Sequence, residues 1–258
     1  MKFTSEIQNE KRLIYINKHK QNLIKLIQQA SYNHSTWQVF SDFVEMAALS
    51  ISNSVDKTQY NAREQRYLEI IKTYDKKHSE LFPQMLNELV QALEVEATDV
   101  LGEIFMELEL GSKWKGQFFT PMSICRLTAE MSLVNVKELI EEKGFITLSE
   151  PACGGGALII AAAETIKNLE LNYQETMLVT AIDLDIKAVH MCYLQLSLLG
   201  IPAIVLHGNT LSMEFYSEWK TPTYILGGWW YKKQNEKSKM IDFKLENDGQ
   251  YSLLDLVS

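Results

Sequence analysis

The chain has 258 residues, of which 46% are hydrophobic and 22% are charged, and its formal net charge is -8. This composition is typical of a globular protein, and it excludes wholesale disorder, a collagen-like repeat and a small disulfide-stapled domain. A protein that grips DNA by charge alone carries excess positive charge, so any DNA contact here needs a local basic patch or a second protein.

The cysteines are Cys125, Cys153 and Cys192, and none belongs to a CxxC pair or a His/Cys metal pattern. Their odd number, together with an N-terminus that lacks an apolar stretch, predicts a protein of the reducing cytoplasm. The longest apolar run, at residues 157–163, is far shorter than the roughly 20 residues that span a bilayer. We therefore expect neither a membrane nor a metal as a partner.

Apolar side chains recur at helical spacing through the first hundred residues, which predicts an α-helical N-terminal region over residues 1–110. One stripe runs from Leu86 to Leu108 and predicts a single helix that follows Pro83 and ends at Gly111. A second amphipathic helix is predicted over residues 121–140. Its apolar positions are Ile124, Leu127, Met131 and Val134. The basic residues of segment 1–25 fit a solvated helix face or, alternatively, a contact with phosphate or a partner.

Four short apolar runs predict strands over residues 145–149, 177–182, 203–206 and 224–226. Helical segments at 157–169 and 186–199 separate the first three of these runs. Strands that alternate with helices predict βαβ units, hence an α/β fold with a parallel sheet and helices on both faces. We assign this fold to residues 111–230. Residues 231–258 then form a C-terminal tail, which adds a strand if 240–245 or 253–257 is extended.

The ends of the predicted strands carry the candidate site. Glu150 ends the first strand, and the glycines 154–156 that follow predict a turn that lets the backbone approach a ligand closely. A purely structural turn is the alternative. An acid at this point suits a cationic or amine-bearing ligand. Asp183 ends the second strand, where an acid can accept the ribose hydroxyls of an adenosine group, and Asp185 is placed to cap the next helix. Asn209, after the third strand, is placed to meet an adenine ring.

Two motifs carry a resemblance to a known family. The sequence Glu-Pro-Ala-Cys-Gly-Gly-Gly at 150–156 resembles the D-P-A-C-G-S-G-G motif of N6-adenine DNA methyltransferases. The sequence Gly-Gln-Phe-Phe-Thr-Pro at 116–121 is similar to their G-Q-[FY]-F-T-P motif, and the two stand in the family's order. Within that family the chain looks most like the modification subunit of type I restriction–modification systems. The resemblance implies a Rossmann-like sheet, short or incomplete here, that binds S-adenosylmethionine.

The resemblance also implies roles for individual residues. Those that close over the methionine end of the cofactor are Phe119, Thr120 and Pro121. Glu150, with Pro151 and Ala152 beside it, takes the position of the motif's acid near the methionine amine and sulfonium. Gly154 and Gly156 form the floor of the site. Asp183 holds the ribose. Asn209 stands where the family has an Asp that accepts a hydrogen bond from the adenine amine, which the Asn carbonyl oxygen can also do.

The family's catalytic motif, N-P-P-[FYW], is absent from this sequence. Its Asn and Pro oxygens accept the two N–H bonds of the target amine, and its aromatic residue stacks on the flipped base. At the expected place the chain has Thr221 to Trp230. Trp229 and Trp230 are candidates for base stacking, or else they pack the C-terminal segment onto the sheet. The catalytic residues are therefore not assigned.

Three functions follow as hypotheses. The first is an active adenine-specific DNA methyltransferase with a divergent site. The second is a catalytically inactive, cofactor-binding subunit with a regulatory, decoy or partner-binding role. The third is a helical interaction protein with a vestigial pocket. The expected partners are DNA, a specificity subunit or another protein, and a second copy of the chain. Basic residues placed to contact DNA are Lys113, Lys115, Lys232 and Lys233.

Overall fold

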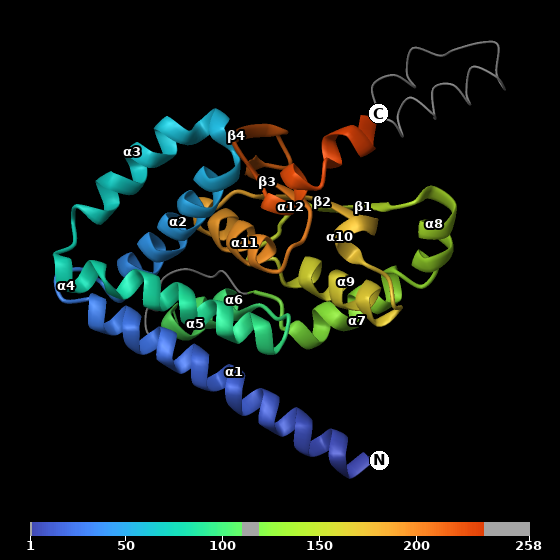
Figure 1. Cartoon of the computed structure of the whole chain (residues 1–258), viewed down its shortest axis with the longest axis horizontal. Coiled ribbons are helices and arrows are strands. Elements are labelled where there is room, and N and C mark those ends of the chain that lie inside the picture. The colour runs from blue at the N-terminus through green and yellow to red at the C-terminus, as the bar shows by residue number, and fades with distance from the viewer. Residues whose placement is uncertain (1, 110–118, 235–258) are drawn as a thin grey trace.

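The computed structural model describes residues 2–109 and 119–234 (Figure 1). Its N-terminal part contains α1 (Lys2–Ala30), α2 (Thr36–Val55), a 3-10 turn η1 (Lys57–Gln59), α3 (Tyr60–Ile71), α4 (Lys76–Ser79), α5 (Leu81–Val95) and α6 (Val100–Glu109). The remainder contains α7 (Met122–Ser132), α8 (Val136–Lys143), β1 (Ile146–Glu150), α9 (Ala157–Asn168), α10 (Tyr173–Thr176), β2 (Met177–Asp183), α11 (Ile186–Leu198), β3 (Ala203–Asn209), β4 (Glu214–Lys220) and α12 (Pro222–Leu226).

The sheet has four strands in the order β1-β2-β3-β4. The first three are parallel, as the sequence predicts, with Glu150 paired to Ala181 and Asp183 paired to His207. Because parallel strands end at the same edge of a sheet, the loops that follow β1, β2 and β3 gather there. The α/β fold class is confirmed, and this edge is where the predicted cofactor-binding residues meet.

The prediction of a fourth strand over residues 224–226 is wrong. These residues lie in α12, which begins with Pro222 at its first turn, and the Thr221 side chain caps it by accepting from the Tyr224 N–H. The actual fourth strand, β4, is antiparallel to β3, so the sheet is mixed. Its sequence mixes aromatic residues, which favour strands, with polar and charged ones, so it forms no long apolar run.

Two predicted helices are each divided. The stripe from Leu86 to Leu108 is broken between α5 and α6, where Glu96 is extended and the Asp99 side chain accepts from the Gly102 N–H. The helix predicted over residues 121–140 is broken between α7 and α8. In α7 the buried residues are Cys125 and Ala129, whereas the four predicted apolar positions on this stretch are exposed. Gly111 lies outside the described residues.

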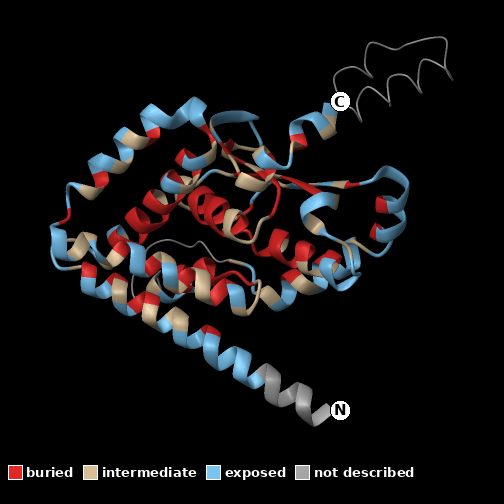
Figure 2. Cartoon of the chain, viewed as in Figure 1, coloured by how far each residue is buried: buried red, intermediate tan, exposed pale blue. Residues whose placement is uncertain are grey.

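One hydrophobic core joins the N-terminal helices to the sheet. It combines residues of α1, α2, α5 and α6 with residues of α9, α11 and one face of β2 and β3, and Figure 2 shows these buried segments meeting in the centre of the molecule. A small second cluster lies on the other face of the sheet, near the ends at which the parallel strands begin. It consists of Phe145, Leu178, Tyr224 and Trp229. Helices on both faces of the sheet were expected, but one face carries most of the packing.

The division of the chain into domains at residues 110 and 230 stays a prediction. None of the described helices is long and apolar enough to cross a membrane.

His190 on α11 makes folding sensitive to pH. It is buried edge-on against Trp219, with 4.8 Å between ring centroids, and this burial lowers its pKa from 6.5 to about 4. Between these values the unfolded chain binds a proton that the folded chain does not, so stability falls as the pH falls. The expected loss attributable to His190 is about 2 kcal/mol at pH 5 relative to neutral pH.

The measurement is the free energy of unfolding by urea at neutral pH and at pH 5, for the wild type and His190→Leu. We expect the difference between the two pH values to be about 2 kcal/mol smaller in the variant. Other titrating groups act in both proteins and cancel. An equal pH dependence in the two proteins contradicts the prediction.

Candidate functional site

The loop after β1 is built around glycines with left-handed backbone. Gly154 has φ +52° and Gly156 has φ +97°, conformations that side-chain-bearing residues rarely adopt. The Asp183 carboxylate, at the end of β2, holds this loop in place, because Oδ2 accepts from the Gly154 N–H at 2.9 Å. Its other oxygen accepts from the Asp185 N–H, also at 2.9 Å. Asp185 itself caps α11, as predicted, by accepting from the Lys187 N–H.

A cavity of about 310 Å³ opens beside the glycine loop. Five of the predicted cofactor-binding residues line it, namely Phe119, Thr120, Glu150, Ala152 and Gly154. Five others do not line it, namely Pro121, Pro151, Gly156, Asp183 and Asn209. Three larger cavities, of about 420, 460 and 540 Å³, lie elsewhere, and no motif residue lines them. The motifs therefore converge on a smaller cavity at the sheet edge.

The residues that do not line the cavity are positioned around it. Pro121 caps α7, and its carbonyl accepts from Ile124 and Cys125. The Pro151 carbonyl accepts from the Thr210 hydroxyl at 2.7 Å, which ties the loop after β1 to the loop after β3. Asn209 Oδ1 accepts from the Leu211 and Ser212 N–H groups, so in this structure it shapes its own loop.

An aromatic chain connects the cavity to the N-terminal helices. The Phe119 ring lies directly over Gly154, since a Cβ built there would be 2.7 Å from two of its ring carbons. Phe119 packs edge-on against Phe105 of α6 at 4.9 Å, and Phe105 packs in the same way against Trp37 of α2 at 4.8 Å. The helical region thus fixes one wall of the cavity. Gly116, Gln117 and Phe118, which begin the same motif, lie outside the described residues.

Sequence reasoning missed two residues that organise the site from within. Asp99, which precedes α6, lines the cavity and is almost completely buried. The Gln195 side chain on α11 is fully buried, and its Nε2 donates to Asp99 Oδ1 and to the Gly155 carbonyl, both at 2.8 Å. Its Oε1 accepts from the Leu101 N–H at 3.0 Å. An Asp directly before a helix is a signal for an N-cap. This signal was missed because the apolar stripe runs through Asp99 and predicts one continuous helix in place of α5 and α6.

Charge in the cavity is negative. Among its described lining residues Asp99 and Glu150 are acidic and none is basic. Burial raises the pKa of Asp99. Burial also raises the pKa of the Cys125 thiol, and the carboxylates of Asp99 and Glu150 raise it further. Such a cavity suits a ligand with positive charge.

Trp229 lies away from this cavity. Its ring is fully buried and packs edge-on against Phe145, the residue before β1, at 5.2 Å, near the opposite ends of the strands. In this position it packs the C-terminal segment onto the sheet and presents no exposed face to a base. Trp230 is about half exposed. The Lys232 ammonium lies 4.4 Å from the centre of the Trp229 ring, while Lys113 and Lys115 lie outside the described residues.

Comparison with known proteins gives one matching family and several matching solved structures, two of which are described here. The sequence profile of the family described as N-6 DNA methylase matches residues 96–252. No curated protein matches the chain. A putative class I S-adenosylmethionine-dependent methyltransferase from Listeria monocytogenes aligns with a TM-score of 0.42 and 14% identity, over 76% of this chain and 55% of its own.

The second solved structure is the methyltransferase subunit of a type I restriction–modification system from Streptococcus thermophilus. It aligns with a TM-score of 0.41 and 12% identity, over 78% of this chain. This chain spans 60% of that subunit's length.

Proposed function

Because the matching residues 96–252 make up 157 of its 258 residues, this chain belongs to the N-6 DNA methylase family, and we propose that it binds S-adenosylmethionine at the cavity beside the glycine loop. The observation that carries the proposal is the convergence of two separate motifs on one cavity, with Phe119 lying on Gly154. When bound, S-adenosylmethionine supplies a methyl group activated by a sulfonium.

The residues present fit this cofactor. A Cβ at Gly154 or Gly155 would collide with Phe119 or Asp99, so the glycines keep the loop backbone close to the cavity. Asp99 and Glu150 provide negative charge for an amine and a sulfonium. Asp183 accepts one backbone hydrogen bond on each oxygen, and a carboxylate has further lone pairs for ribose hydroxyls. The volume of about 310 Å³ is at the small end for ligand sites, and it suits the methionine end of the molecule.

Methyl transfer to adenine in DNA is the activity that the family name implies. The chain contains no N-P-P sequence to accept the N–H bonds of the target amine, and Trp229 is buried away from the cavity. These two observations favour a subunit that binds the cofactor and acts through a partner over an enzyme complete in itself. An active adenine-specific methyltransferase is the second candidate, favoured by the family match.

Two assays test the proposal. Calorimetric titration with S-adenosylmethionine should show binding to the purified chain. Radiolabelled methyl transfer to mixed-sequence genomic DNA then separates the two candidates. Binding without transfer supports the partner-dependent subunit, and transfer supports the enzyme. Absence of binding contradicts both candidates and favours the third hypothesis, a helical interaction protein whose cofactor pocket is vestigial.

A single methyl group tests whether the glycine loop forms the binding site. In Gly154→Ala the new Cβ is 2.7 Å from the Phe119 ring, so the ring has to move off the cavity wall. We expect a loss of affinity for S-adenosylmethionine of about 10-fold, which is about 1.4 kcal/mol.

The matched control is Gly144→Ala. Gly144 also has a left-handed backbone, with φ +84°, but nothing lies within 4 Å of its Cβ position. Both variants should lose about 1–2 kcal/mol of stability to backbone strain, while Gly144→Ala keeps wild-type affinity. Equal affinities in the two variants place the site elsewhere.

A further inference from the structure

Asp99 is a buried acidic residue, and its packing within the protein does not explain why a charged side chain stands there. It is 3% exposed and lines the cavity. Both hydrogen bonds that it accepts from described residues reach Oδ1, one from Gln195 and one from the Gly102 N–H, each at 2.8 Å. No ion pair within the described part of the chain involves it. A buried carboxylate without a cation is costly, and it is either protonated or matched by a positive group from a ligand.

The space for this carboxylate is reserved by glycines on two sides. A Cβ at Gly102 would lie 2.0 Å from Asp99 Oδ2, and a Cβ at Gly155 would lie 2.5 Å from Oδ1. Gln195 fixes the orientation of the group, because the same Nε2 also donates to the Gly155 carbonyl. The carboxylate is therefore held rigidly against the glycine loop, beside the wall formed by Phe119 and Thr120.

An ordinary N-cap does not account for this arrangement. The cap function of Asp99 uses one oxygen and the Gly102 N–H, and an Asn side chain would serve equally well. The basic residue closest in sequence to the cavity wall, Arg126, is engaged by Glu96 and by Glu164. The described residues therefore supply no positive charge to match Asp99, and a bound ligand can supply one.

We propose that Asp99 is the acceptor for the ammonium group at the amino-acid end of the bound cofactor, with Gln195 as the residue that positions it. This inference rests on the proposed function, since it assigns one contact within that site. On this inference the ammonium group binds to Asp99, which is buried and held in place by hydrogen bonds, and not to the half-buried Glu150. A charge-assisted hydrogen bond of this kind accounts for about 10- to 100-fold in affinity.

The test compares two ligands on one conservative variant. Asp99→Asn keeps the shape, the cap and the Oδ1 acceptor, and removes only the charge. Calorimetry with S-adenosylmethionine should show a 10- to 100-fold loss of affinity relative to the wild type. With 5′-methylthioadenosine, which has no amino-acid end, wild type and variant should bind equally. The control Glu107→Gln removes an exposed acid from α6 and should leave both affinities unchanged.

Each other outcome is decisive. Equal losses for both ligands assign Asp99 a structural role and overturn the inference. So does unchanged binding of S-adenosylmethionine to Asp99→Asn, which leaves the proposed function standing. A wild-type chain that binds neither ligand contradicts the proposed function itself, and the inference falls with it. If Asp99→Asn does not fold, Gln195→Met, which removes the hydrogen bond that positions the Asp99 carboxylate, replaces it with the same ligand-specific expectation.

Discussion

Asp183→Ala is expected to lower the affinity for S-adenosylmethionine by at least about 100-fold. The Asp183 carboxylate accepts from the Gly154 and Asp185 N–H groups and so joins the glycine loop to the end of β2. Removing it takes away two hydrogen bonds to a charged group, each of about 1.5–3 kcal/mol. It also takes away the acceptor that we propose for the ribose hydroxyls. Calorimetric titration measures the change directly.

The control is Asp185→Ala, two residues away. Asp185 caps α11 and makes no described contact with the glycine loop. Its loss should cost about 1 kcal/mol of stability and leave the affinity within about twofold of the wild type. If Asp183→Ala binds as the wild type does, the cofactor is not held at the ends of β1 and β2.

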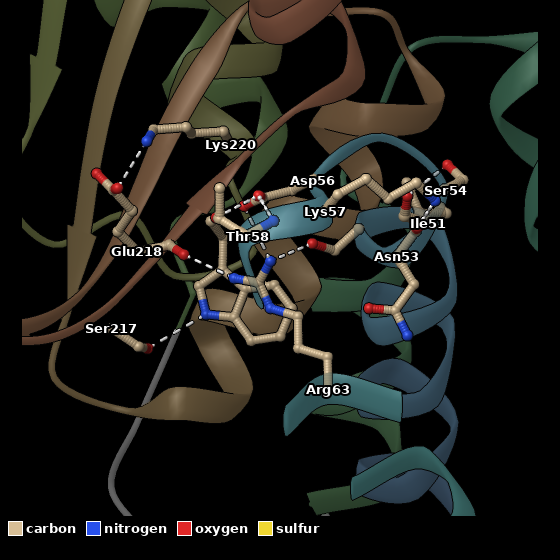
Figure 3. Close-up of polar contacts among 12 residues, drawn as sticks. Ile51, Asn53, Ser54, Asp56, Lys57, Thr58, Arg63, Ser217, Glu218 and Lys220 are labelled. Carbon is tan, nitrogen blue, oxygen red and sulfur yellow. Dashed lines mark hydrogen bonds and ion pairs between the residues drawn. The ribbon is translucent and has the colours of Figure 1, made fainter. Parts of the chain in front are cut away.

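The largest expected change in stability comes from Arg63 on α3. Figure 3 shows its guanidinium between α3 and β4, where it donates to the Glu218 carbonyl at 2.8 Å and to Asp56 Oδ2 at 3.2 Å. It also donates to the Ser52 hydroxyl, and it stacks 4.2 Å from the centre of the Trp219 ring. Arg63 is 8% exposed. Arg63 therefore connects the helical N-terminal region to the antiparallel strand β4 through these contacts.

We expect Arg63→Met to lower the free energy of unfolding by about 3–5 kcal/mol, because it leaves Asp56 charged and buried without its cation. The matched control, Arg66→Met, removes an arginine from the same helix. Arg66 pairs with Glu45, but its side chain is half exposed, so the expected loss is below about 1 kcal/mol. Urea denaturation of both variants measures the difference. Equal small losses contradict the assigned role of Arg63.

The sequence alone determined the features that depend on local patterns. The parallel strands β1, β2 and β3, the glycine turn at 154–156 and the Asp185 cap follow from short-range propensity. The helical spacing of apolar residues in the first hundred positions likewise predicts the helical region to which α1 and α2 belong. These features could be predicted because each is fixed by a few neighbouring residues, whatever they later pack against.

Only the tertiary structure decided what lies next to what. β4 has no apolar run, and only the tertiary structure shows that it pairs with β3 and that Arg63 and α11 cover its Trp219. Asp99 reads as part of one long helical stripe, and only the packing of α6 on α11 turns its carboxylate toward the glycine loop. Trp229 stands where a stacking residue is expected, yet burial against Phe145 draws it to the other end of the sheet. Contacts between distant segments depend on the free energy of burial, which the local sequence does not encode.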